Sequence, residues 1–243
     1  MAVKTTGSSR REKLASFEAA RKKEQRNRTI RLLVICVVLA ALLLAYPVYL
    51  FVDDYRARNA DLATIGVDAA TAACDPPTET QASGSQDHVP DGTKVTYTEF
   101  PPASGQHYQA PAPFTKRFYT MADRPPVETL VHNLEHGYTV LWYRENAPQD
   151  VIRGAERAAK TFGGDDYNPA DKFIAAPWSD ADGGPFPEGK NVVLARWTAN
   201  PQDPSDTTQQ LSVHQGCGQL SGQVIKDFMA KYPYSSSPEP NGA

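Results

Sequence analysis

The chain has 243 residues and a formal net charge of −3 at pH 7, an average that conceals two regions of opposite sign. Residues 1–31 contain ten Lys and Arg against three Glu, a net charge of +7, so the remainder carries −10. Residues 32–52 between them contain no charged side chain. This distribution excludes an ordinary soluble cytoplasmic enzyme and a multipass transporter. Because the larger part is acidic, it also argues against nucleic acid as a partner.

The uncharged segment, residues 32–52, is predicted to be a transmembrane helix. A helix of this length spans roughly 30 Å, the hydrocarbon thickness of a bilayer. Since the positive flank precedes the segment, residues 1–31 are predicted to be a basic cytoplasmic arm and the acidic remainder to be extracytoplasmic. The apolar run is longer than the 7–15 residues of a cleaved signal peptide, which favours an uncleaved, single-pass anchor in the cell membrane.

The basic arm has two interpretations. Leu14 and Phe17 on one side of a helical segment are compatible with an amphipathic helix that binds a partner or anionic lipid. We favour the simpler interpretation, a solvated charge cluster that sets topology, because the apolar face is small.

Beyond the anchor, the sequence predicts a stalk and linker at 53–84, an external globular domain at 85–232 and a disordered tail at 233–243, with 75–93 and 101–113 irregular. Apolar alternation predicts strands, and 3.6-residue periodicity with Pro and Gly boundaries predicts helices. Asp123 is a candidate N-cap of the first helix, and Gly137 ends it. The expected fold is an α+β domain, a small mixed sheet with about three helices. The strands are 94–98, 138–143, 173–176 and 192–198, and the helices are 125–136, 150–162 and 218–231.

Two cysteines, Cys74 and Cys217, lie in the predicted external part, whereas Cys36 lies within the anchor. An even number of cysteines in an oxidising compartment indicates a disulfide, here closing a 143-residue loop. Metal ligation through His214-x-x-Cys217, and unpaired or intermolecular thiols, are the alternatives.

All five histidines lie in the same external part. His132 and His136 are four residues apart, which places both rings on one face of a helix. His132-x-x-Glu135-His136 has the form of the inverzincin motif, in which two histidines bind zinc and the glutamate is the base. Gly137 directly after the motif, and the absence of an evident second helix with a carboxylate ligand, argue against a peptidase.

His107, in a glycine-containing loop, could join His132 and His136 in a three-histidine site for zinc or copper, with His88 or Glu135 as a fourth ligand. The alternative is a hydrogen-bonded core in which the rings connect a long loop to a helix. Two functions remain open. One is a binding or accessory module of an envelope or membrane complex; the other is a metal-dependent envelope hydrolase or redox enzyme with Glu135 as base.

Two sequence blocks resemble a known family. PPASGQHY at 101–108 is similar to a PPxSGxHY block, and VHNLEHGYTVLWY at 131–143 is similar to a VHxLEHGxVxxWY block. With His88 upstream and a Pro-Glu pair near the C-terminus, these blocks resemble domain-of-unknown-function family 3105 over about residues 85–235. The resemblance implies a bacterial, largely actinobacterial, membrane-anchored protein with an external domain, and it implies no activity.

Overall fold

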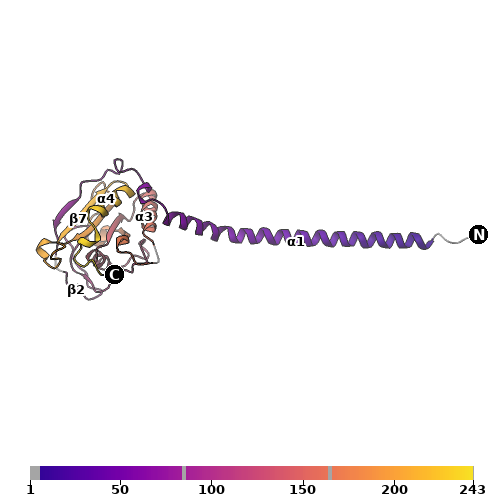
Figure 1. Ribbon diagram of the computed structural model, residues 1–243, viewed down its shortest axis with the longest axis horizontal. Helices are drawn as coiled ribbons and strands as arrows, with labels where there is room; N and C mark the ends of the chain where they lie inside the picture. The colour runs from indigo at the N-terminus through magenta and orange to yellow at the C-terminus, as the bar shows by residue number, and fades with distance from the viewer. Residues whose placement is uncertain (1–5, 84–85, 164–165, 243) are drawn as a thin grey trace, which may run out of the picture. The chain divides into compact units, whose positions relative to one another are not determined.

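A computed structural model describes residues 6–83, 86–163 and 166–242 of the chain. The predicted linker boundary at 84–85 and the last residue, 243, therefore lie outside the described residues. The chain divides into two compact units, Met1–Asp54 and Tyr55–Ala243. Helices and strands keep the labels of Figure 1.

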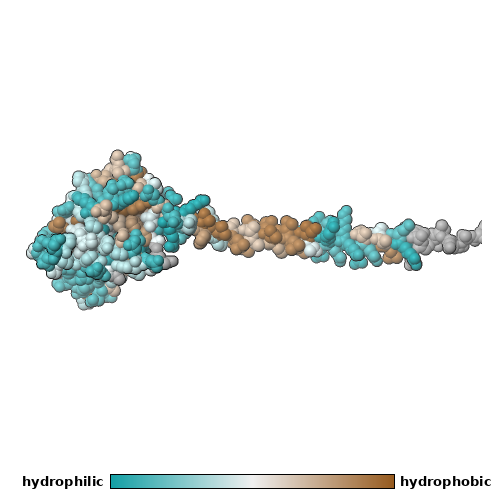
Figure 2. Space-filling view, viewed as in Figure 1, coloured by the Kyte–Doolittle hydropathy of each residue, from teal (hydrophilic) through white to brown (hydrophobic). Residues whose placement is uncertain are grey.

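The described residues of the first unit form helix α1, Thr6–Arg58, whose last four residues belong to the second unit. Among the described residues, α1 is the one helix long and apolar enough to cross a membrane, and a signal sequence near the N-terminus would have the same character. Figure 2 shows its two parts, a hydrophilic N-terminal portion and a hydrophobic portion that follows it. The predicted apolar N-terminal helix is confirmed.

The second unit is the predicted α+β domain, built on a five-stranded mixed sheet with the order β1-β7-β6-β4-β5. β4 and β5 are parallel, and the other neighbouring strands are antiparallel. A separate pair, β2 and β3, is parallel. The main elements of the second unit are β1 Thr78–Gln81, β2 His88–Val89, β3 His107–Tyr108, α2 Val127–Glu135, β4 Thr139–Arg144, α3 Gln149–Thr161, β5 Phe173–Trp178, β6 Val192–Thr198, β7 Leu211–Cys217 and α4 Gly222–Lys231.

Helices cover both faces of the sheet, which explains why its central strands are apolar along their whole length. Along β4, Val140 and Trp142 pack with α2, whereas Leu141 and Tyr143 pack with α3 and α4. The side chains of a strand alternate between its two faces, so β4 contributes to two separate cores. The core on the α2 side fixes the helix that carries the His132-x-x-Glu135-His136 motif.

The Cys74–Cys217 disulfide is confirmed. It joins the segment preceding β1 to the last residue of β7, next to the antiparallel pairing of those two strands. With Cys217 in a disulfide, the alternative of metal ligation through His214-x-x-Cys217 is wrong. Cys36, in α1, is the free cysteine of the described chain.

Most predicted elements are confirmed, but the strand at 94–98 is wrong. That segment is irregular because its groups bond to α2 and a loop rather than to a strand. Val95 N donates to Glu128 Oε1 at 3.1 Å, and the Tyr97 hydroxyl donates to the Gln106 carbonyl at 2.9 Å. Asp123 is likewise not the cap of α2. It accepts from Thr120 N, and α2 begins after Pro126 without a side-chain cap.

The linker predicted at 53–84, and the irregular segment at 75–93, contain parts of the folded unit. Ile65 and Ala72 are buried in the core of the α3 side, and β1 forms an edge of the sheet. All four side chains of β1 are exposed, so the strand has no apolar alternation that would reveal it. β7 was also missed, because the half-buried residues 214–216 interrupt its apolar pattern.

The tail at 233–243 was predicted to be disordered, and this is wrong for its described residues. Ala199 N donates to the Ser236 carbonyl, and Glu239 N donates to the Glu135 carbonyl at 3.0 Å. The buried Lys172 ammonium donates to the carbonyls of Pro240 and Gly242 at 2.9 and 2.7 Å. These bonds order the tail through its backbone, so its polar composition gave no sign of them.

Gly137→Ala is expected to lower the free energy of unfolding by about 2 kcal/mol or more. Gly137 has φ +85°, and a Cβ there would meet the Tyr234 carbonyl oxygen at 2.6 Å and Ser237 Oγ at 2.8 Å. Gly189→Ala is the matched control, since Gly189 has φ +70° but a Cβ there meets nothing within 4 Å. Chemical denaturation should show the larger loss for Gly137→Ala, and equal losses would contradict the packing argument.

Candidate metal site

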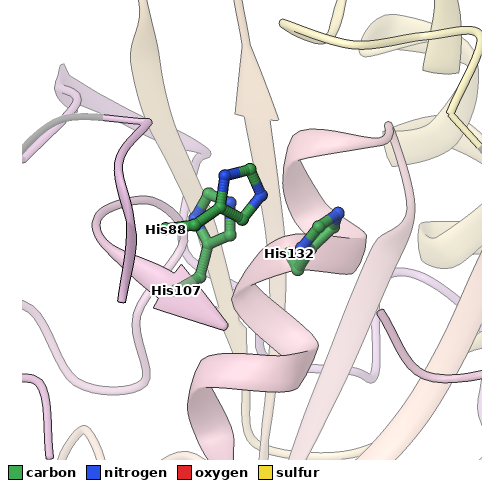
Figure 3. Close-up of side chains that lie close together, drawn as sticks. All are labelled: His88, His107 and His132. Carbon is green, nitrogen blue, oxygen red and sulfur yellow. The ribbon is translucent and has the colours of Figure 1, made fainter. Parts of the chain in front are cut away.

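Three histidines from separate segments meet beside helix α2. His107 comes from β3, His132 from α2, and His88 from β2, where it is the register partner of His107. Figure 3 shows the three rings gathered between these elements. Their centroids lie 4.7 Å apart for His88 and His107, 4.9 Å for His107 and His132, and 5.0 Å for His88 and His132.

Two of these rings are held in one tautomer by backbone carbonyls. His107 Nδ1 lies 2.8 Å from the Gly105 carbonyl oxygen, and His132 Nδ1 lies 2.6 Å from that of Tyr108. A carbonyl oxygen only accepts, so each Nδ1 carries a proton and donates it. In the neutral ring, Nε2 then presents a lone pair. Histidines that bind metals are oriented in this way, by a hydrogen bond from the other ring nitrogen.

The described residues contain two groups of three side chains that could hold a metal ion. In each group the ligand atoms lie within 4.8 Å of one another. The first is His88, His107 and His132; the second is His132, Glu135 and His136. His88 is exposed, whereas the other four side chains are buried. His132 belongs to both groups.

Glu135 connects the two groups. Its Oε2 lies 2.9 Å from His107 Nε2, and its Oε1 accepts from Gln86 Nε2 at 2.8 Å. Burial would raise the pKa of this carboxyl, but the contacts with His107 and Gln86 outweigh it, so the pKa is lowered. His107 Nδ1 already donates to the Gly105 carbonyl. The contact between His107 Nε2 and the Glu135 carboxylate therefore requires either a second proton on the ring or a cation between the two groups.

His132 and His136 are in a similar position. Their Nε2 atoms lie 3.0 Å apart, a contact that needs a proton or a metal ion between two lone pairs. Burial lowers the pKa of His132 to about 4, opposed by its bond to Tyr108, and the neighbouring His136 lowers it further. The His132 ring is therefore neutral at pH 7, which is the form that binds a metal.

A family model described as "Protein of unknown function (DUF3105)" matches residues 88–243. The chain belongs to the DUF3105 family. The match begins at His88 and contains both groups of candidate ligands. No curated protein and no solved structure matches the chain. The function of this DUF3105 protein must therefore be argued from its own site.

The predicted triad of His107, His132 and His136 is divided between the two groups. His107 groups with His88, which the sequence offered only as a fourth ligand, and His136 groups with Glu135. His214, the fifth histidine, is part of neither group: it lies on β7, with Nε2 2.9 Å from the Pro101 carbonyl oxygen.

Sequence reasoning missed two residues that contact this site of the DUF3105 domain. The first is Gln86, whose Nε2 donates to Glu135 Oε1 and whose Oε1 accepts from Gln210 Nε2 at 2.9 Å. The second is Glu239, whose Oε2 lies 3.4 Å from His136 Nε2. The Pro-Glu pair near the C-terminus was the available signal for Glu239, whereas Gln86 carries no motif.

Proposed function

We propose that this DUF3105 protein is a single-pass cell-membrane protein whose external domain binds a transition-metal ion, zinc or copper, and serves as a binding or accessory module of an envelope complex. The main observation behind this proposal is the pair of buried imidazoles of His107 and His132. Each is fixed through Nδ1 on a carbonyl, so the atom that can bind an ion is Nε2. This atom faces Glu135 Oε2 in His107 and His136 Nε2 in His132. His88 supplies a third nitrogen.

The chemistry of the donor atoms supports this assignment. Neutral imidazoles with a carboxylate nearby are the ligands of zinc and copper rather than of magnesium or calcium. The ligand atoms of each group lie within 4.8 Å of one another, so small movements of the side chains would bring them to the zinc–nitrogen distance of about 2.0–2.1 Å.

The membrane part of the proposal is supported by charge and length. The uncharged segment at 32–52 forms part of one helix, and the net charge of +7 precedes it. By the positive-inside rule this arrangement leaves the metal-binding domain outside the cytoplasm. A disulfide in that domain agrees with an oxidising compartment.

The enzyme alternative has less support. A glutamate that acts as a base on water must reach that water, but Glu135 is 0% exposed and its two oxygens contact Gln86 and His107. In this setting Glu135 orients a ring or binds the metal. The structure therefore favours a binding module over a hydrolase of the inverzincin type.

Metal analysis of the full-length protein in detergent micelles tests the proposal. After treatment with a chelator, the protein is expected to take up Co²⁺ and Zn²⁺ again, and Co²⁺ should give the visible absorption of nitrogen-ligated cobalt. His132→Ala is expected to abolish this uptake because His132 belongs to both groups. A His132→Ala protein that binds as much metal as the wild type would refute ligation.

His214→Ala is the matched control for this experiment. It removes a histidine of the same domain that contacts Pro101 rather than the cluster, so metal uptake should be unchanged. Thermal unfolding of each variant shows whether a loss of metal reflects a loss of fold. Equal losses of metal from His214→Ala and His132→Ala would contradict ligation by the cluster.

A further inference from the structure

The two groups of candidate ligands overlap at His132. We infer that the cluster is a two-position metal relay, in which one ion moves between an outer position at His88, His107 and His132 and an inner position at His132, Glu135 and His136. This inference rests on the proposed metal binding and states how the site handles the ion.

Only one ion can be held at a time, because the shared residue has one nitrogen to give. His132 Nδ1 donates to the Tyr108 carbonyl at 2.6 Å, so both positions depend on Nε2. An imidazole bridges two metals only through its two different nitrogens, and here one of them is occupied. The outer and inner positions are therefore alternatives, and His132 stays bound while the other ligands exchange.

Exposure gives the relay a direction. The outer position includes His88, the exposed ring of the cluster, whereas all three members of the inner position are buried. An ion from solvent therefore meets the outer position first. The donor atoms differ as well: three imidazoles form the outer position, and two imidazoles with a carboxylate form the inner one. The carboxylate charge favours a divalent cation at the inner position.

The inner position leads to the C-terminal segment. Glu239 Oε2 lies 3.4 Å from His136 Nε2, and the Glu239 side chain is 52% exposed. Lys172 fixes this segment against α2, donating to the carbonyls of His136, Pro240 and Gly242. The candidate ligands thus run from the exposed His88 through buried side chains to His136, beside which lies the half-exposed Glu239.

The wild-type full chain in detergent micelles provides the first test, with Co²⁺ as the probe. We expect binding of one Co²⁺ per chain, with contact-shifted imidazole resonances from both His88 and His136, since only a ligating ring shows a contact shift. Two ions bound per chain, or contact shifts confined to one of these two residues, would overturn the relay while leaving metal binding intact. No binding at all would refute the proposed function, and the relay with it.

Variants provide the second test. His88→Ala leaves the inner position complete, and His136→Ala leaves the outer position complete, so each is expected to retain one Co²⁺ with its own absorption spectrum. The double variant His88→Ala/His136→Ala should lose binding, and His214→Ala should resemble the wild type. Loss of binding in a folded His88→Ala or His136→Ala protein would show a single position and overturn the relay. The wild-type measurement decides the matter if either variant does not fold.

Discussion

Replacing both Cys74 and Cys217 with alanine is expected to lower the free energy of unfolding by on the order of 4–5 kcal/mol. The disulfide closes a loop of 143 residues that includes the five-stranded sheet, from β1 to β7. Without it, the unfolded chain regains the conformational freedom that the loop had removed. Since β1 is a short edge strand with exposed side chains, we expect its pairing with β7 to be the first part lost.

Urea denaturation of the full chain in detergent micelles, with and without a reducing agent, measures this effect. Cys36→Ala is the matched control, because Cys36 is a free thiol in α1 and its loss opens no loop. We expect the reduced wild type and the double alanine variant to have similar midpoints, both well below that of Cys36→Ala. A double variant as stable as the oxidised wild type would contradict the loop-closure argument.

The metal-free protein is expected to lose about 3 kcal/mol of unfolding free energy between pH 6.5 and pH 4 through His132 alone. Burial lowers the pKa of this ring to about 4. The unfolded chain therefore takes up a proton near pH 6.5 that the folded chain refuses until pH 4. The contribution of His132 to stability is fully present above pH 6.5 and is lost as the pH falls to the folded pKa of about 4. Glu135, whose pKa is also lowered, adds a loss that begins below about pH 4.5.

Denaturation of chelator-treated protein at a series of pH values measures this slope. His132→Gln, which has no titrating ring, should flatten the slope between pH 6.5 and pH 4. Burial also lowers the pKa of His214, so His132→Gln/His214→Gln should flatten it further. A slope that is identical in the wild type and in His132→Gln would show that the ring is not held neutral by burial.

The candidate site shows where local pattern is sufficient and where it is not. The spacing of His132 and His136 placed two rings together because the helix itself fixes that distance. The spacing of residues could not predict which histidine lies next to His107. The grouping of His107 with His88 depends on the parallel pairing of β2 and β3 across an irregular loop. Nor could the spacing show that Glu135 turns toward His107 and Gln86 rather than toward solvent.

The sequence by itself determined the +7, neutral and −10 division of the chain, the apolar helix and the central strands, because charge, length and periodicity are properties of neighbouring residues. Only the tertiary structure decided among the open fates of Cys217, ordered the C-terminal tail and divided five candidate ligands into two groups around His132. These outcomes depend on contacts between residues far apart in the chain. Such contacts form through burial and backbone hydrogen bonding, which leave no periodic pattern in the sequence.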